Sequence, residues 1–213
     1  MAVRKILKWP SAKLRLKSKE VSNFEEAGSL AVDIRDTMRA NLGVGVAAPQ
    51  IGFNLKILVV DAKHLPSIEP SKTVTDTCVL INPEVIPLTE ETFSWEEACL
   101  SVDDVQSEVK RFSSISLQYQ DLEQVSHSVE LHGEESGVVQ HEADHLDGRI
   151  FIDRLPMFER RRVIKKLRRK NADKNSERKK KNKKKLAEIK RQNSRKDRKK
   201  TKKTFGKNKR NKK

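Results

Sequence analysis

The sequence contains few of the features that mark exported or membrane-bound proteins. Only 2 of its 213 residues are cysteines, too few for a disulfide framework. This scarcity indicates a reducing compartment, in which a cysteine is free for chemistry. No run approaches the roughly 18 apolar residues that a membrane-spanning helix needs, and the basic start of the chain leads into no apolar signal core. We therefore expect a cytoplasmic protein that does not bind membranes.

Aromatic residues are also scarce, at 5%, whereas charged residues make up 36% of the chain. Residues 159–213 hold 30 basic and 5 acidic side chains, and residues 1–158 hold 16 basic and 25 acidic ones. A lysine-rich segment with almost no bulky apolar residue cannot form a core. The sequence thus predicts a globular domain in residues 1–158, a basic helix in residues 159–170 and a disordered tail in residues 171–213.

Hydrophobic periodicity predicts three helices. Apolar side chains recur every three or four residues over 24–42, which indicates an amphipathic helix. Ser22 and Glu25 form a predicted capping box at its start, and Gly43 suits a left-handed residue at its end. Two further helices are predicted over residues 134–146 and 156–170.

Short runs rich in β-branched residues predict strands over residues 55–60, 78–86, 115–119 and 128–131. Turn residues accompany these runs, Pro66 and Pro70 between the first two and Asn82-Pro83 within the second. Such turn residues favour a meander of mostly antiparallel strands over repeated βαβ units.

The pattern H-E-x-x-H over residues 141–145 carries the clearest chemical signal. On a helix, His141 and His145 lie on one face, so both can reach one metal ion while Glu142 acts beside them as a base. A hydrolytic metal site uses three protein ligands and keeps one position open. Cys99, in a polar segment, is a candidate third ligand, whereas Cys78 lies in an apolar strand and is expected in the core. A polar helix face is the alternative for this motif taken alone.

The segment 43–50 contains two glycines and two alanines before a proline and Gln50. These small residues leave the backbone open to a close neighbour. The spacing does not fit the G-x-G-x-x-G fingerprint of dinucleotide-binding proteins, and the segment follows a helix rather than a strand. Nucleotide binding is therefore not indicated, and a plain tight turn is the alternative.

Together these segments resemble the peptide deformylase family, whose motifs are G-x-G-x-A-A-P-Q, E-G-C-L-S and Q-H-E-x-D-H in this order. They correspond to residues 43–50, 97–101 and 140–145. Shorter similarities extend the resemblance over residues 3–155, and none covers the lysine-rich tail. The resemblance implies an α+β domain with antiparallel strands around a central H-E-x-x-H helix. It also implies metal-dependent hydrolysis of the N-formyl group from the initiator methionine of nascent polypeptides, with release of formate.

The resemblance further implies a metal site. The implied ligands are Cys99, His141 and His145, and the implied ion is Fe²⁺, with Zn²⁺ or another divalent metal possible. Such an ion lowers the pKa of bound water from about 15.7 toward 7. Glu142 would then take the water's proton and pass it to the leaving amine. The Gln50 side chain and the Leu100 backbone N–H are the implied donors to the oxyanion.

Substrate contacts follow from the same resemblance. Gly45 would let the substrate backbone lie alongside as an added strand. Val44, Glu97 and Val138 are the other implied substrate-binding residues. Arg111 is expected to pair with Glu97 and hold the cysteine loop.

Two positions depart from the family pattern. Ala98 replaces a glycine, and if this position needed a positive φ the added methyl group would cost about 1 kcal/mol. Gly137 replaces a bulky aliphatic residue beside the methionine pocket, so an altered preference for the first substrate residue is expected.

The basic tail is expected to bind polyanions by releasing counterions, in a salt-dependent way. Ribosomal RNA is the expected partner, because the family acts on chains that emerge from the ribosome. Few aromatic residues interleave the lysines, so base stacking is not indicated. The alternative is a solvated polycation that aids solubility.

Two rival functions remain at this point. An RNA-binding protein with an inactive domain would not need the complete set of candidate ligands and base. A zinc protease would leave the motifs at 43–50 and 97–101 unexplained. The sequence therefore predicts a monomeric deformylase.

Overall fold

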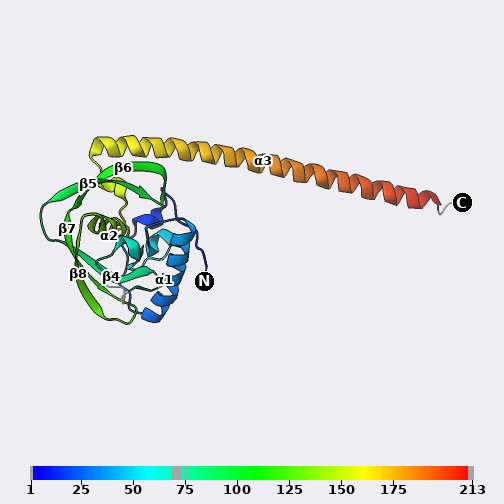
Figure 1. Cartoon of the computed structure of the whole chain (residues 1–213). Coiled ribbons are helices and arrows are strands. Elements are labelled where there is room, and N and C mark those ends of the chain that lie inside the picture. The colour runs from blue at the N-terminus through cyan, green and yellow to red at the C-terminus, as the bar shows by residue number, and fades with distance from the viewer. Residues whose placement is uncertain (1, 69–72, 75, 211–213) are drawn as a thin grey trace. The chain divides into compact units, whose positions relative to one another are not determined.

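The computed structural model describes residues 2–68, 73–74 and 76–210. Its internal contacts divide the chain into two units, Met1–Arg160 and Arg161–Lys213. The first unit contains all the described strands and the helices α1 (Phe24–Ala40) and α2 (Gly133–Leu146), and α3 (Met157–Arg210) begins at its end (Figure 1). The finer division at residues 158 and 170 stays a prediction.

Helix α3 is longer than the sequence analysis predicts. The structure continues it to Arg210, past the end predicted near Lys170. The prediction followed the apolar stripe, which stops near Leu167, but a helix needs no such stripe to form hydrogen bonds along its own backbone. Lysine and arginine have high helix propensity, and no proline follows Pro156. Among the described residues, no helix is both long and apolar enough to cross a membrane.

Helix α1 begins at Phe24 as predicted, but the residues that cap its two ends differ from the prediction. Asn23 is the N-cap residue, because its side chain accepts a hydrogen bond from the Glu26 N–H at 3.2 Å. The capping box predicted at Ser22 is therefore wrong. At the other end, Leu42 and not Gly43 has the left-handed backbone, with a φ of 54°. The Gly43 N–H still bonds the Met38 carbonyl at 3.0 Å and closes the helix.

The main sheet is antiparallel throughout, as the predicted meander requires. Its order is β1-β2-β4-β7-β8, and β3 pairs with β4. The strands are β1 (Gly45–Ala47), β2 (Ile57–Asp61), β3 (Thr73–Val74), β4 (Thr77–Pro87), β7 (Ser114–Gln120) and β8 (Ser126–His132). Four of them, β2, β4, β7 and β8, match the predicted strands. The expected α+β class is thereby confirmed.

A second sheet of two strands, β5 (Thr92–Cys99) and β6 (Val102–Phe112), was not predicted. Its strands carry charged residues at exposed alternate positions, so they lack the apolar runs that signal a buried strand. Short 3-10 helices complete the unit: η1 (Ala12–Arg15), η2 (Ala48–Ile51), η3 (Ala62–His64) and η5 (Phe151–Arg154).

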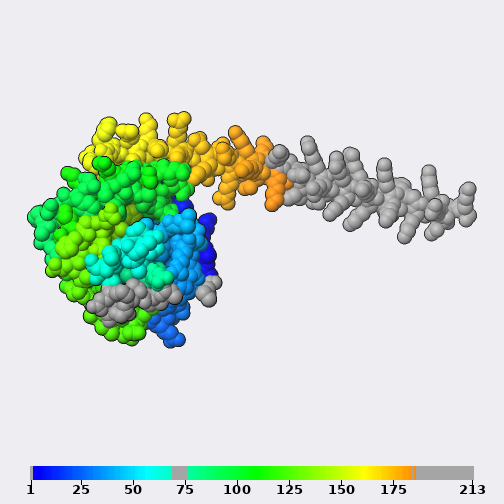
Figure 2. All heavy atoms as spheres, viewed as in Figure 1, coloured from blue at the N-terminus to red at the C-terminus, as the bar shows by residue number. Residues whose placement is uncertain are grey.

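The core lies on both faces of the main sheet. In β2, Ile57 and Val59 pack in one cluster with α1, whereas Leu58 and Val60 pack in the other with α2. This split follows from the alternation of side chains along a strand. The space-filling view shows α1 (blue) at one side of the unit and β5 and β6 (green) at another (Figure 2). Helix α2 contacts the main sheet and also β6, so its polar side chains are enclosed.

Candidate metal centre

Three buried side chains from two elements meet beside α2. Cys99 ends β5, and His141 and His145 lie one turn apart on α2. One ligand atom from each lies within 4.8 Å of the others. The Cys99 Sγ is 3.3 Å from His145 Nε2, and the two imidazole rings meet edge to face with centroids 5.5 Å apart. The structure thus brings together the three ligands that the sequence predicts.

The electrostatics of this group favour the ligating form of the cysteine. Burial alone would raise the pKa of Cys99, but His145 and His141 beside it hold the pKa well below its ordinary value. The thiolate is the form that binds metals. His145 Nδ1 is buried with no hydrogen-bond partner among the described residues. One thiolate and two imidazoles are a ligand set that fits a divalent transition-metal ion.

Glu97 lies directly behind His141. Its Oε2 is 2.6 Å from His141 Nδ1, and Arg111 donates to its two oxygens at 2.7 and 3.0 Å. Burial would raise the pKa of Glu97, but the hydrogen bonds from His141 and Arg111 lower it to about 2. An ionised carboxylate at Nδ1 fixes the imidazole ring and leaves its other nitrogen for a ligand position. Because Glu97 is 3% exposed, its predicted contact with substrate stays a prediction.

Arg111 connects Glu97 with Asp144 on α2. Its Nη1 donates to Asp144 Oδ2 at 2.7 Å, and Arg154 binds the same carboxylate. The Arg111 side chain is buried, and its two carboxylate partners accept hydrogen bonds from its guanidinium group. Asp144 is a residue that the sequence analysis did not assign. The signal was present, because Asp144 stands inside the H-E-x-x-H pattern, but its partners come from distant segments.

Glu142 follows His141 on α2 and is 5% exposed. Burial raises the pKa of its carboxyl above the ordinary value, although His141 and His145 act to lower it. Its Oε2 has no hydrogen-bond partner among the described residues. The carboxylate is therefore available to a molecule that enters the site.

Gln50, on η2, faces the same group. Its Nε2 is 3.6 Å from Cys99 Sγ and 3.3 Å from Ser101 Oγ, while its Oε1 accepts from the Ala47 N–H at 2.8 Å. The bond to Ala47 fixes which end of the amide points toward Cys99. Leu100 follows Cys99 directly, so its backbone N–H lies next to the ligand.

Residues 7–9 form hydrogen bonds with the two segments that carry Gln50 and Leu100. These bonds were not predicted from the sequence. The Leu7 N–H bonds the Gln50 carbonyl at 2.7 Å, and the Trp9 N–H bonds the Ser101 carbonyl at 2.9 Å. The Lys8 ammonium group donates to the Leu100 carbonyl at 2.6 Å. No residue pattern near the start of the chain reveals such bonds, because they depend on backbone groups.

The remaining predicted residues lie at different depths. Gly45 begins β1, which is the edge of the main sheet, and Val44 before it is 39% exposed. Val138 is 6% exposed and packs in the core cluster on the α2 side of the sheet. Ala98 lies at a β-bulge and is not among the described residues with positive φ. The positive φ on which a cost at Ala98 would depend is therefore absent.

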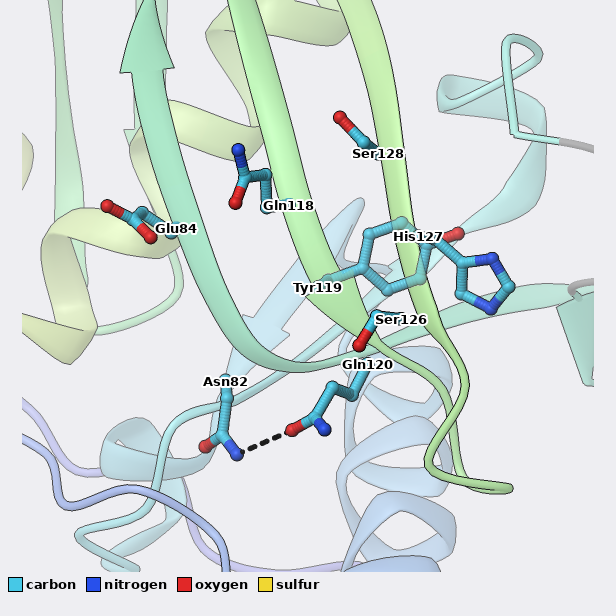
Figure 3. A pocket seen from close by; sticks show the side chains of 8 residues that line it. All are labelled: Asn82, Glu84, Gln118, Tyr119, Gln120, Ser126, His127 and Ser128. Atoms are coloured by element: carbon cyan, nitrogen blue, oxygen red, sulfur yellow. Dashed lines mark hydrogen bonds between the residues drawn. The ribbon is translucent and has the colours of Figure 1, made fainter.

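A separate pocket lies along β4, β7 and β8 of the main sheet (Figure 3). Its lining residues come from β4, β7 and β8 and include none of the metal group: Asn82, Glu84, Gln118, Tyr119, Gln120, Ser126, His127 and Ser128. The Asn82 amide has a structural role. Its oxygen accepts from the Val21 N–H, and its nitrogen donates to the Val21 carbonyl and to the Gln120 side chain. This pocket contributes nothing to the metal centre.

Comparisons with known proteins agree with this geometry. The model of the polypeptide deformylase family matches residues 3–161. The peptide deformylase of Campylobacter jejuni is 38% identical over 176 residues, which are 82% of this chain and 99% of the relative. The crystal structure of the Legionella pneumophila peptide deformylase has a TM-score of 0.69 at 31% identity, and the match covers 82% of this chain and 98% of that one. The Ehrlichia chaffeensis peptide deformylase in complex with actinonin gives 0.69 at 32% identity, with 80% and 98% covered. The chain therefore belongs to the peptide deformylase family and is an enzyme of that family.

Proposed function

We propose that the chain removes the N-formyl group from the initiator methionine of nascent polypeptides, with Cys99, His141 and His145 as the metal ligands. The observation that carries this assignment is the convergence of these three ligand atoms within 4.8 Å, beside a buried carboxylate with a free oxygen. A divalent cation held there supplies a Lewis acid that activates water and polarises a carbonyl.

Glu142 is the proposed general base. Its free Oε2 can accept the proton that water loses as it attacks the formyl carbon, and can then give that proton to the departing amine nitrogen. Because burial raises the pKa of this carboxyl, its proton affinity lies closer to neutrality than that of an exposed glutamate. A base of this kind is more effective in proton transfer at neutral pH.

Gln50 and Leu100 are the proposed donors to the oxyanion that forms on the formyl oxygen. The Gln50 Nε2 is already aimed at the cysteine side of the site by the bond from Ala47 to Oε1. Donors fixed in this way need no reorientation during the reaction, and loss of one such donor typically costs about 10²- to 10³-fold in rate. The backbone bond from Leu7 to the Gln50 carbonyl and the Lys8 side-chain bond to the Leu100 carbonyl hold the two segments that carry these donors.

The substrate backbone is proposed to extend the main sheet at β1. This strand pairs with β2 on one side, and it is the end member of the sheet order. An edge strand offers unpaired backbone groups to an extended peptide. Gly45 and Val44 would contact this peptide, and Val138 and Glu97 would line the site more deeply.

The proposed native ion is Fe²⁺, with Zn²⁺ as the alternative. The ligand set fits both ions, so the test is to purify the protein without oxygen, load it separately with Fe²⁺ and Zn²⁺ and measure formate release per bound ion. Higher turnover with Fe²⁺ supports the proposal. Equal or higher turnover with Zn²⁺ contradicts it. A Cys99→Ser variant, which should bind either ion more weakly, serves as the control for site occupancy.

A second role is proposed for residues 159–213, which hold 30 basic and 5 acidic side chains. This charge density favours salt-dependent binding to ribosomal RNA. Such binding would place a monomeric enzyme in the cytoplasm beside emerging chains. The two cysteines are free, as expected for a reducing compartment.

A further inference from the structure

The side chain of Lys8 bonds the backbone directly after the cysteine of the metal group. Its ammonium nitrogen donates to the Leu100 carbonyl at 2.6 Å, and this carbonyl belongs to the peptide group that joins Leu100 to Ser101. The N–H of the same peptide group donates to Cys99 Sγ at 3.4 Å. One peptide group therefore receives a hydrogen bond from a cation at its oxygen and gives one to the sulfur at its nitrogen.

The backbone around this peptide group is also held by other bonds. Ser101 is fully buried, its carbonyl accepts from the Trp9 N–H at 2.9 Å, and its hydroxyl oxygen lies 3.3 Å from the Gln50 amide nitrogen. None of these bonds uses the Lys8 side chain, so they remain when that side chain is changed. A change at Lys8 is therefore expected to alter the strength of the bond to Cys99 more than its geometry.

A second partner, Asp103 on β6, locates the ammonium group. The Lys8 Nζ lies 2.7 Å from Asp103 Oδ1, and the two side chains are 46% and 39% exposed. An ion pair this exposed contributes little to the stability of a protein. Its geometric effect is to keep a positive charge beside the Leu100 carbonyl, in the turn that connects β5 with β6.

A positive charge at a carbonyl oxygen polarises the whole amide group. Hydrogen bonds from an ionised donor are stronger than those between neutral groups, and bonds linked in a chain strengthen one another. The Lys8 ammonium group therefore makes the Ser101 N–H a stronger donor to Cys99. Such a bond withdraws electron density from a thiolate, and hydrogen bonds around a ligating sulfur are one means by which a protein tunes its metal.

We propose that Lys8 is a positioning residue of the metal centre, whose charge acts through the peptide group after Leu100 to withdraw electron density from the Cys99 thiolate. A divalent cation bound to that thiolate is then a stronger Lewis acid, and Lewis acidity is what polarises a carbonyl group for attack. This inference rests on the proposed function, because it assumes that Cys99 ligates the cation. It gives an exposed side chain outside the ligand set a part in the reaction.

The spectroscopic test uses Co²⁺-loaded protein, in which the thiolate-to-cobalt charge-transfer band in the near ultraviolet reports the electron density on sulfur. Lys8→Met keeps a side chain of similar length without the charge, so the band should shift to longer wavelength. Lys8→Arg retains a cationic donor and should keep the wild-type band. Lys5→Met, at an exposed lysine of the same segment, is the control and should also leave the band in place.

Kinetics on formyl-Met-Ala-Ser give a second readout. Because Lys8 is proposed to act on the cation and not on the substrate, Lys8→Met should lower kcat about tenfold and leave KM within about twofold of wild type. Lys8→Arg should recover most of this loss. Metal content and circular dichroism are measured for each variant. A rise in KM with unchanged kcat in Lys8→Met would overturn the inference.

The band also separates this inference from the proposed function, because it needs bound Co²⁺ but no turnover. An unshifted band in Lys8→Met, or an equal shift in Lys8→Arg, overturns the inference even if the wild type releases formate. A wild type without a thiolate-to-cobalt band overturns it as well, because Cys99 would then not be a ligand. A band that shifts as expected in a protein that releases no formate supports the inference and overturns the proposed function instead.

Discussion

The carboxylate of Glu142 occupies the space in which a side chain at Gly45 would have to lie. A Cβ built at Gly45 would be 2.7 Å from Glu142 Oε1 and 2.9 Å from its Cγ and Cδ. The edge of the main sheet and the H-E-x-x-H helix are therefore in direct contact at the reacting centre. This contact explains why a glycine is needed at the first position of β1.

Gly45→Ala is expected to lower kcat by about tenfold or more, because the methyl group displaces Glu142 from the position where it accepts a proton. Misplacement of a catalytic group by about 1 Å is enough for losses up to about 10²-fold. Steady-state kinetics on a formyl-methionyl peptide measure the effect. Gly28→Ala is the matched control, because its added Cβ would have an ordinary contact at 3.8 Å and lies outside the site. Unchanged kcat in Gly45→Ala would show that the contact does not constrain Glu142.

Arg111→Met is expected to destabilise the folded protein by about 3 kcal/mol or more. Removal of the guanidinium leaves two buried carboxylates, Glu97 and Asp144, without their shared partner. Urea denaturation monitored by circular dichroism measures the free energy of unfolding. Lys63→Met removes an exposed ion pair with Asp61 and should change stability by less than about 1 kcal/mol. Similar effects of the two substitutions would contradict this account of the buried network.

Asp33 gives a prediction for acid stability that does not involve the metal. The hydrogen bond from Arg4, together with the one from the Ala2 N–H, lowers the pKa of Asp33 below its ordinary value of 3.8. A lowered pKa in the folded state means that ionised Asp33 stabilises the protein above about pH 4, and that this contribution is lost as the pH falls through the lowered pKa. The stability difference between wild type and Asp33→Asn should therefore be constant from pH 7 to 5 and shrink below pH 4.

Chemical denaturation at a series of pH values checks this prediction. In an Arg4→Met background the effect of Asp33→Asn should be smaller at neutral pH, because the main hydrogen-bond donor is gone. A stability difference that grows as the pH falls would mean that Asp33 is not held ionised by Arg4.

Truncation after Lys170 should leave the hydrolysis of small formyl peptides unchanged and weaken association with ribosomes. The catalytic residues all lie in the unit Met1–Arg160, whereas 22 of the 30 basic side chains of residues 159–213 follow residue 170. Co-sedimentation with ribosomes at several salt concentrations measures the change, and binding by the full chain should fall steeply as salt rises. Equal sedimentation of the full chain and the truncated chain would contradict the proposed role of the tail.

The sequence predicts the parts of this molecule whose signals are local. The four-residue spacing of His141 and His145 predicts a shared helix face, and the apolar runs predict β2, β4, β7 and β8. The N-cap of α1 was predicted wrongly because both Asn23 and Ser22 are good caps, and periodicity does not choose between them. The strands β5 and β6 were missed because polar residues occupy their alternate positions, and they therefore lack the continuous apolar run that indicated the other strands.

The supporting contacts of the site could not be predicted in the same way. The bond from Lys8 to the Leu100 carbonyl and the two bonds of Arg111 join segments that are far apart in the chain. The closeness of Gly137 and Trp95 is likewise a matter of distance in space, because a Cβ at Gly137 would lie 2.9 Å from the Trp95 ring. The departure at Gly137 was visible in the sequence, but only the structure shows which side chain occupies the vacated volume.

The central claim is that Glu142 and the metal bound by Cys99, His141 and His145 hydrolyse a formyl group. The most direct test is formate release from formyl-Met-Ala-Ser by anaerobically purified, Fe²⁺-loaded protein, with Glu142→Ala measured beside it and the bound metal quantified in both. The account predicts formate from the wild type, none above background from Glu142→Ala and equal metal content in the two proteins. Sustained formate release by Glu142→Ala, or none from a folded and fully loaded wild type, would contradict it.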